Sequence, residues 1–351
     1  MSGDLRAPKP RLPDERHAML ILRHREVRDI LASRRDLVVE EVGDTYRRHA
    51  EGLTTVPHSI FLRFPDMPKD RIIGLPAYVR DGEKSAAIGM KWIASFPGNV
   101  ARGIERASAV IVLNDPETGR PAALVEGSEI SAHRTAASAA IGARALSLET
   151  APEEVALVGC GPINRQVLHY LCDTWPTLDR LRLFDLDAER ARRFGEEAAK
   201  RHGLNVMVGG SVAETIAGQR LIALATTATT PHLDLGPAAG NATVLHVSLR
   251  DVQVPEILAA QNVVDDADHV SREQTSVHLA EQASGSRDFI DAEIGAILCD
   301  PASFRRDPAR RAIYSPFGLG SLDIALADRV RRIAQAASQG IVIDGFLPGE
   351  A

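Results

Sequence analysis

The chain of 351 residues has few cysteines, few aromatic residues and no excess of positive charge. Its formal net charge of −6 argues against non-specific binding to nucleic acids, which requires a basic surface that displaces counterions. No apolar run approaches the roughly 20 residues that cross a membrane. The three cysteines, Cys160, Cys172 and Cys299, form no CxxC pair, and the histidines lack metal-ligand spacing. We therefore expect no nucleic-acid partner, no membrane span, no disulfide framework and no metal site.

The rest of the composition is that of an ordinary globular protein, with 44% hydrophobic and 25% charged residues. The first residues, MSGDLRAPKPRLPDER, are polar and proline-rich and contain no apolar core of the kind that a secretory signal needs. Together with the scarcity of cysteine, this stretch predicts a cytoplasmic protein. A length of 351 residues exceeds that of a typical single domain and predicts two domains.

The first part of the chain has the pattern of a mixed α+β domain. A short strand and amphipathic helices at 18–50 are followed at 56–126 by strand-like pieces, separated by Pro, Gly and Asp turns. These pieces predict a mixed or antiparallel sheet. A long alanine-rich helix follows, with Ser128 or Ser131 as its expected N-cap.

The pattern changes after Pro152, where short apolar strands alternate with helices. Such alternation is typical of a parallel, doubly wound sheet with helices on both faces. We therefore predict an α/β fold, with a Rossmann-type domain at 131–320 and a different domain at 1–130.

The stretch VALVGCGPIN is the most informative part of this second region. An apolar, β-branched run precedes Gly159-Cys160-Gly161, and an amphipathic helix follows. Gly159 allows a tight turn, and Gly161 lets the backbone approach a pyrophosphate at the positive end of that helix. The third glycine of the usual pattern is Asn164 here. We interpret Cys160 as a small residue that fits the turn and not as a reactive thiol.

A second apolar run, LRLFD, ends on Asp185, where a carboxylate can accept hydrogen bonds from a ribose 2′-hydroxyl. Because this carboxylate repels a 2′-phosphate, the sequence favours NAD over NADP as the cofactor. Further candidates for cofactor contacts lie beside the glycine turn, at other strand ends and near helix starts: Pro162, Ile163, Asn164, Thr135, Thr226, Thr227, Ser248, Gly318 and Gly320.

Three charged residues outside the turn are candidates for the chemistry. Lys91 lies in the apolar run IGMKWIASF, where it either faces water from an edge strand or points into a cleft. Arg134 lies among small residues of a predicted helix. Its guanidinium group either binds a substrate carboxylate or lies on the helix surface in water. Asp251 follows a strand of the second region, where it either activates water or caps the next helix.

These segments together resemble the ornithine cyclodeaminase/mu-crystallin family over roughly residues 18–340. The resemblance implies a substrate domain that also forms a homodimer, completed by the C-terminal helix at 321–351, and a Rossmann domain. It implies a reaction through an imine, made by hydride transfer between an amino-acid Cα and NAD. It places a catalytic lysine on Lys91, a carboxylate-binding arginine on Arg134, and an acid that handles water or the leaving amine on Asp251. The segments that carry it are LPAYV, GMKWIASFPGN, VLNDPETGRPAALVEG, SAHRTAASAA, VGCGPIN, FDLD and LRDVQVPE.

Two departures from the family pattern argue against ornithine as the substrate. The Pro-x-Arg of many members is Pro57-His58-Ser59 here, and the usual Asp-Gly after the hairpin is Glu126-Gly127. One branch is matched better, namely the N-(2-amino-2-carboxyethyl)-L-glutamate dehydrogenases, which make L-2,3-diaminopropionate for siderophores and peptide antibiotics. The strings similar to that branch include SIFLRFP, KDRIIGLPAYV, LVEGSEIS, SLRD and YSPFGLGSLD.

The branch implies that NAD accepts a hydride from the glutamyl Cα and that water then cleaves the imine to 2-oxoglutarate and L-2,3-diaminopropionate. A substrate with three carboxylates needs further cations, and Arg63 is our candidate. Three alternatives stay open: an ornithine cyclodeaminase, an imino-acid or ketimine reductase using NADPH, and a non-catalytic binder like mu-crystallin. Asp185 argues against the reductase, and the presence of Lys91, Arg134 and Asp251 together argues against the binder.

Overall fold

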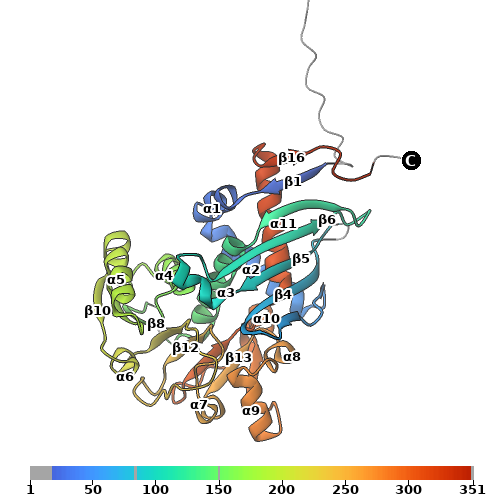
Figure 1. Cartoon of the computed structure of the whole chain (residues 1–351). Coiled ribbons are helices and arrows are strands. Elements are labelled where there is room, and N and C mark those ends of the chain that lie inside the picture. The colour runs from blue at the N-terminus through green and yellow to red at the C-terminus, as the bar shows by residue number, and fades with distance from the viewer. Residues whose placement is uncertain (1–17, 83–84, 149–150, 349–351) are drawn as a thin grey trace, which may run out of the picture.

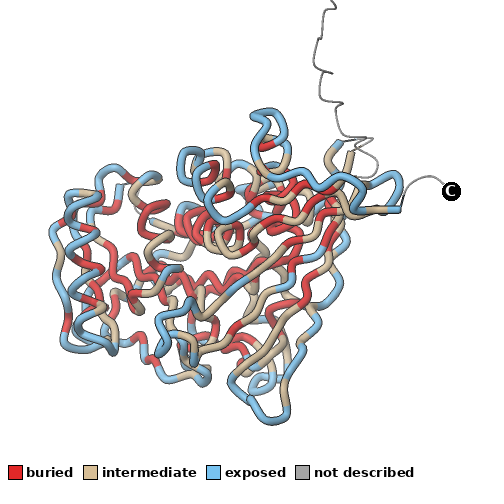
Figure 2. Tube along the Cα trace, turned by 45° about the horizontal axis from the view of Figure 1, so that its top comes forward, coloured by how far each residue is buried: buried red, intermediate tan, exposed pale blue. Residues whose placement is uncertain are grey.

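Figure 1 shows the computed structural model of the chain, which describes residues 18–82, 85–148 and 151–348. The polar N-terminal stretch of the sequence lies outside the described residues. Within them, the strands form two sheets of eight strands each. Figure 2 shows the buried residues inside both parts of the molecule and the exposed ones along loops and outer helices. The predicted fold class, a Rossmann-type parallel sheet with an α+β part, is confirmed.

The N-terminal sheet takes strands from both ends of the chain. Its order is β16-β1-β7-β6-β5-β4-β2, with β3 also paired to β4, and every pair except β1 with β7 is antiparallel. Its strands are β1 (Met19–Leu22), β2 (Thr54–Thr55), β3 (Ile60–Phe64), β4 (Met67–Arg80), β5 (Ala86–Ser95), β6 (Ala107–Asn114), β7 (Pro121–Glu126) and β16 (Ile341–Ile343).

Helices cover one face of this sheet. Alternate residues such as Leu75, Ile111 and Leu113 are buried, whereas Met90 and Trp92 on the other face remain more than a third exposed. This alternation follows from the two-residue period of a strand. The helix α11 packs on β4, β5 and β6, and it also contacts α2 and α3. The helices of this part are α1 (His24–Ala32), α2 (Arg35–Ala50), the short η1 (Pro97–Arg102), α3 (Ser128–Leu146) and α11 (Gly320–Ala336).

The second sheet is entirely parallel, with the order β10-β9-β8-β11-β12-β15-β13-β14. Most of its central strands are buried along their whole length, as expected for a parallel sheet covered on both faces. The strands are β8 (Glu154–Val158), β9 (Arg180–Phe184), β10 (Asn205–Val208), β11 (Leu221–Leu224), β12 (Thr243–His246), β13 (Gln261–Val264), β14 (Ile290–Glu293) and β15 (Ala312–Ser315).

The strand β8 lies between β9 and β11, where the order of the sheet changes direction. In such sheets the carboxyl ends of the two diverging strands open a crevice in which ligands bind. The helices of this part are α4 (Pro162–Thr174), α5 (Ala188–His202), α6 (Val212–Ile216), α7 (Val254–Ala259), α8 (Ala267–Val270), α9 (Ser276–Ser284), α10 (Ile294–Cys299) and the short η2 (Pro301–Ser303).

The start of α3 differs from the prediction. Neither Ser128 nor Ser131 is the N-cap, which is Gly127. The carboxylate of Glu126 caps the helix instead, accepting hydrogen bonds from the backbone N–H of Ser128 (2.7 Å) and of Glu129 (3.2 Å). The sequence boundary at residues 130 and 131 therefore falls inside the first turn of this helix, which contacts elements of both parts.

Two further observations concern expected absences. Among the helices of the described ranges, none has both the length and the apolar character needed to traverse a bilayer. In the same ranges, no three His, Cys, Asp or Glu side chains gather as the ligands of a metal ion would.

A buried glycine on α3 makes the packing of the two parts testable. A Cβ at Gly142 would lie 2.2 Å from Cδ1 of Tyr314, whereas a Cβ at Gly43 on α2 would meet its nearest neighbour at 3.6 Å. We expect Gly142→Ala to destabilise the protein by about 1–3 kcal/mol through overpacking. Gly43→Ala should be neutral or stabilise by about 0.5–1 kcal/mol, since alanine is the better helix former. Chemical denaturation of both variants measures the difference, and equal effects would contradict the packing described.

Candidate active site

Lys91 points into the protein from the middle of β5. It pairs with Leu75 on β4 and Ile111 on β6, so its side chain shares their buried face. The residue is 2% exposed, which excludes the alternative of a lysine that faces water. Its Nζ donates to Oδ2 of Asp323 on α11 (2.6 Å) and to Oγ of Ser131 on α3 (3.2 Å).

Arg134 reaches the same acid from α3. Its Nε donates to Oδ1 of Asp323 at 3.2 Å, and one terminal nitrogen lies 3.4 Å from Oγ of Ser131. Arg134 is 9% exposed and Asp323 is completely buried, so the alternative of a surface arginine is also excluded. Two cations from different elements therefore share one buried carboxylate.

The electrostatics of this group favour a partly neutral lysine. Burial lowers the pKa of Lys91 to about 8; the carboxylate of Asp323 opposes this lowering, and the positive charge of Arg134 adds to it. A lysine with such a pKa can accept and release a proton near neutral pH.

Gly318 and Gly320 have packing roles beside this group. Gly318 has a φ of +92°, and a Cβ there would lie 2.3 Å from a guanidinium nitrogen of Arg134. The buried carboxylate of Asp265 holds this turn, accepting from the backbone N–H of Gly318 at 2.6 Å. A Cβ at Gly320, where α11 begins, would lie 3.2 Å from that of Leu75. Their predicted contact with a cofactor stays a prediction.

Asp251 lies beyond the carboxyl end of β12 and is completely buried. Its carboxylate accepts hydrogen bonds from the hydroxyls of Thr226 and Ser248. The helix α7 begins at Val254 with Gln253 as its N-cap, so the capping alternative for Asp251 is wrong. Two of the predicted cofactor contacts thus hold an acid at the edge of the parallel sheet.

A buried histidine, to which the sequence gave no role in the site, completes this network. Nε2 of His246 accepts the backbone N–H of Asp251 (3.1 Å) and lies 3.6 Å from its carboxylate. Burial by itself raises the pKa of Asp251, but the neighbouring His246 and the hydroxyls of Ser248 and Thr226 outweigh burial and lower this pKa below its usual value. Asp251 is therefore a carboxylate at neutral pH.

The turn after β8 has the features that a dinucleotide requires. Gly159 has a φ of +92°, and a Cβ there would lie 2.4 Å from the carbonyl oxygen of Ala225, so only glycine fits. A Cβ at Gly161, the N-cap of α4, would meet no atom within 4 Å, which leaves open space at the helix N-terminus. A pyrophosphate fits this arrangement of backbone N–H groups and helix dipole.

Asn164 takes the place of the third glycine without opening the structure. It is completely buried, and its Nδ2 donates to the carbonyl oxygens of Val158 (3.0 Å) and Gly159 (2.7 Å). Beside it, the carboxylate of Asp185 accepts from the backbone N–H of Cys160 at 2.8 Å. Burial and the charge of Asp185 raise the pKa of the Cys160 thiol to about 12, which fits a structural role for that residue.

The remaining predicted cofactor contacts have fewer structural observations to support them. Pro162 and Ile163 open α4 beside the turn, and Thr227 is exposed just after β11. Thr135 lies seven residues after the first residue of α3 (135 − 128), so the prediction that it occupies the N-terminal turn of a helix is wrong. The amides around it already bond within the helix.

Arg63 is not part of the Lys91 group. It lies on β3 with its side chain 57% exposed and pairs with the carboxylate of Glu273. The carbonyl oxygen of Glu273 accepts hydrogen bonds from Arg250, the neighbour of Asp251. Arg63 and Asp251 are thus linked across the two parts of the molecule.

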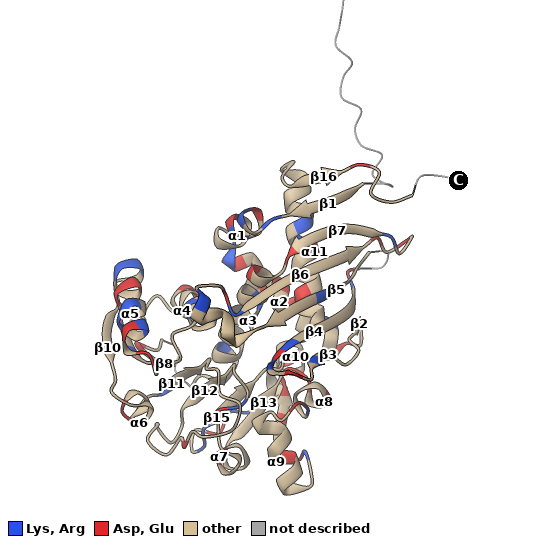
Figure 3. Ribbon diagram, viewed as in Figure 1, with Lys and Arg blue, Asp and Glu red and all other residues tan. Residues whose placement is uncertain are grey.

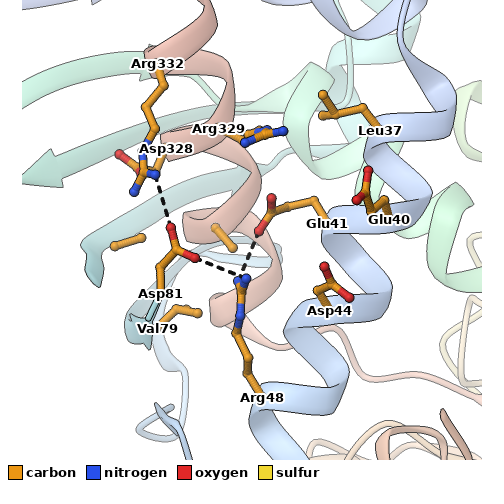
Figure 4. A pocket seen from close by; sticks show the side chains of 12 residues that line it. Leu37, Glu40, Glu41, Asp44, Arg48, Val79, Asp81, Asp328, Arg329 and Arg332 are labelled. Carbon is orange, nitrogen blue, oxygen red and sulfur yellow. Dashed lines mark hydrogen bonds and ion pairs between the residues drawn. The ribbon is translucent and has the colours of Figure 1, made fainter. Parts of the chain in front are cut away.

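A pocket of about 120 Å³ between α2 and α11 contains none of the predicted site residues (Figure 4). Several of its charges are paired with one another: Arg48 contacts Glu41 and Asp81, and Arg332 contacts Asp81 and Asp328. We therefore place the candidate site at Lys91, Arg134 and Asp251 and not in this pocket.

Comparison with known proteins identifies the family of the chain. A model of the ornithine cyclodeaminase/mu-crystallin family matches residues 18–338. The chain belongs to this family. The family resemblance predicted from the sequence is therefore confirmed.

Relatives in the family have different activities. N-((2S)-2-amino-2-carboxyethyl)-L-glutamate dehydrogenase of Staphylococcus aureus is 27% identical, over 93% of this chain and 98% of the relative. Alanine dehydrogenase of Archaeoglobus fulgidus is 25% identical over the same shares. The solved Δ1-pyrroline-2-carboxylate reductase of Thermococcus litoralis, in complex with NADH and L-proline, has a TM-score of 0.85 at 23% identity, covering 92% of this chain and 99% of that one.

The shared acid makes a direct test of the Lys91 group. We expect Asp323→Asn to destabilise the protein by about 3–5 kcal/mol, because it leaves two buried cations without a counter-charge. Adding Lys91→Met to that variant should recover part of the loss. As a control, Asp44→Asn breaks a surface pair with Arg47, both side chains 43% exposed, and should cost less than about 1 kcal/mol. Urea unfolding of the wild type and the three variants measures these changes in the free energy of unfolding. Similar losses of stability for Asp323→Asn and Asp44→Asn would refute the role given to Asp323.

Proposed function

We propose that this protein catalyses the NAD-dependent oxidative cleavage of N-(2-amino-2-carboxyethyl)-L-glutamate. One substrate molecule, one NAD⁺ and one water would give 2-oxoglutarate, L-2,3-diaminopropionate, NADH and a proton. The observation that carries the proposal is the buried group of Lys91, Arg134 and Asp323, a cationic site suited to an amino-acid carboxylate beside a proton acceptor. The Staphylococcus aureus relative, matched over nearly its whole length, supports this choice of substrate.

The residues of the N-terminal sheet and α3 would bind and deprotonate the substrate. The guanidinium fork of Arg134 suits the α-carboxylate of the glutamyl part, and Ser131 adds a hydroxyl beside it. Lys91 would take the proton from the substrate nitrogen, since a buried lysine with its lowered pKa is partly neutral near pH 8. Loss of that proton frees the nitrogen lone pair that is needed to form the C=N bond.

Asp251 would act on water. Its carboxylate is ionised, buried and oriented by Thr226 and Ser248, so it can accept a proton from a water that adds to the C=N carbon. It can then return that proton to the departing amine of diaminopropionate. The hydroxyl proton that is lost as the C=O bond forms also goes to this amine, and the proton taken by Lys91 is the one released to solvent.

The NAD site would lie at the turn after β8. The pyrophosphate would rest on Gly159, Gly161 and the start of α4, and Asp185 would accept the ribose hydroxyls. When bound there, NAD supplies the hydride acceptor for the oxidation of the C–N bond. This arrangement would make 131–320 the cofactor domain and residues 1–130, with the C-terminal segment, the substrate domain. The predicted helix at 321–351 is too long, because α11 ends at Ala336 and β16 follows at Ile341–Ile343, where it pairs with β1.

We also propose that the protein is a homodimer. The face of the N-terminal sheet opposite α11 carries Met90 (37% exposed) and Trp92 (36%), and Ile60 and Leu62 on β3 are 63% and 43% exposed. A second copy packed on these apolar side chains would remove them from water. Sedimentation of the wild type and of Trp92→Glu tests this proposal, which requires a dimer in the first and a weakened dimer in the second.

The activity itself is tested by absorbance at 340 nm. With NAD and N-(2-amino-2-carboxyethyl)-L-glutamate we expect NADH, 2-oxoglutarate and 2,3-diaminopropionate, identified by mass, and little reaction with NADP. A parallel sample contains L-ornithine and NAD. Proline and ammonia from ornithine without net NADH would replace the proposal with a cyclodeaminase, and no reaction in either sample would refute it.

The pH dependence tests the role of Lys91. Its pKa of about 8 predicts that kcat/KM falls about tenfold per pH unit below pH 8, where the lysine is protonated, and levels off above it. Lys91→Ala should abolish turnover but leave NAD binding intact, whereas Lys200→Ala on the surface of α5 should change neither. The titration of the substrate amine, followed by NMR, is the control for the profile. A flat profile from pH 6 to 9 would make Lys91 a fixed cation instead of a base.

A further inference from the structure

Three half-buried arginines and the exposed Arg63 gather at one end of the site. In the strand register, Arg63 on β3 pairs with Arg71 on β4, and Arg71 pairs with Ser95 at the end of β5. Ser95 follows Lys91 by four residues on the same strand, so both side chains share the buried face. The arginine cluster, defined as Arg71, Arg106 and Arg250 with Arg63 at its rim, therefore continues the surface on which Lys91 lies.

The contacts of the cluster leave donor groups free. Nε of Arg106 donates to Oγ of Ser95 (3.2 Å), and two nitrogens of Arg250 donate to the carbonyl oxygen of Glu273 (3.2 and 2.6 Å). Nε of Arg71 is buried and has no hydrogen-bond partner. A buried guanidinium donor without a partner is costly and marks a place where a ligand acceptor would be stabilised.

The charge of the cluster is not balanced from within. Burial lowers the pKa of Arg71, Arg106 and Arg250, and in each case a neighbouring arginine lowers it further. Two acids oppose this lowering: Glu273, whose carboxylate is paired with Arg63, and Asp251, which acts on Arg250. Since guanidinium groups stay protonated, such a cluster attracts an anion, and its planar forks suit a carboxylate.

The position of the cluster fits one end of an extended substrate. Ser95 lies roughly 13 Å along the strand from Lys91. A five-carbon substrate skeleton and the side chain of an arginine together span this distance. Arg250 directly precedes Asp251 in the sequence, so the cluster also borders the acid proposed to activate water. The α-carboxylate and the far end of the substrate would thus have separate cationic partners.

We propose that Arg71, Arg106 and Arg250 bind the carboxylate at the end of the glutamyl side chain and so select a dicarboxylate skeleton. This inference rests on the proposed function. It differs from our sequence prediction, because Arg63 is mostly exposed and already paired, whereas the other three arginines lie deeper.

The test compares two keto acids of equal length, 2-oxoglutarate and 2-oxopentanoate, which differ in the terminal carboxylate. Calorimetry on the full-length protein saturated with NADH measures both dissociation constants. We expect the wild type to prefer 2-oxoglutarate by about 10- to 100-fold, the range for losing a charge-assisted hydrogen bond. Arg71→Gln and, separately, Arg106→Gln should remove most of that preference and leave the affinity for 2-oxopentanoate unchanged.

Two controls keep the result specific. Arg193→Gln removes the same charge from the outer surface of α5, which carries many charges of both signs (Figure 3), and should preserve the preference. Arg71→Lys should restore part of it, since a cation returns without the fork. Thermal unfolding shows whether each variant is folded. If either Arg71→Gln or Arg106→Gln is not folded, the other of these two variants tests the proposal.

The outcomes separate this inference from the proposed function. Equal binding of the two keto acids by the wild type, or an unchanged preference in both folded variants, would overturn the inference. If the variants lose the preference but the wild type does not cleave N-(2-amino-2-carboxyethyl)-L-glutamate, the proposed function fails and the dicarboxylate site stands. If cleavage occurs, Arg71→Gln should raise KM for that substrate much more than it lowers kcat.

Discussion

The carboxylate of Asp323 is the interaction on which the site depends. It is completely buried, yet it faces Lys91 from β5 and Arg134 from α3, and it belongs to a helix near the end of the chain. Two cations and one anion cannot be buried unless they compensate one another, since each alone carries a large desolvation cost. This constraint fixes how α11 must return to the N-terminal sheet and gives the group a net positive charge suited to an anion.

A second constraint comes from the parallel sheet. Strands that run in the same direction bring their carboxyl ends to one edge, so the glycine turn after β8 and the network around Asp251 lie on the same side of that sheet. Asp251 is held by hydroxyls that follow two different strands. In the function we propose, the two parts of the molecule contribute different tasks: one provides cations and a proton acceptor, and the other provides an ionised carboxylate and a place for a dinucleotide.

The sequence predicted regular elements well and isolated side chains less well. The long helices and the alternation after Pro152 follow from local periodicity, which the chain carries in every window. Short elements such as α8, β14 and β16 have too few residues for a clear period. The sequence did not point to Asp323, and it gave Ser131 and His246 no role in the site, because each looks like an ordinary helix or strand residue. The available signals were an acid and a histidine within apolar runs. Arg71 lies in a strand among other charged residues. The role we propose for it depends on its neighbours Arg63 and Ser95 on the adjacent strands.

The sequence by itself determined the fold class, the family and the glycine turn, because these depend on the order and spacing of residues along the chain. It could not decide whether Lys91 faces water or a cleft, whether Arg134 lies on a surface, or whether Asp251 caps a helix. Each of those questions concerns contacts between residues that are far apart in sequence, from 25 positions for Thr226 and Asp251 to 232 for Lys91 and Asp323. Tertiary structure decided them, since only folding removes these groups from water and makes one carboxylate serve two cations.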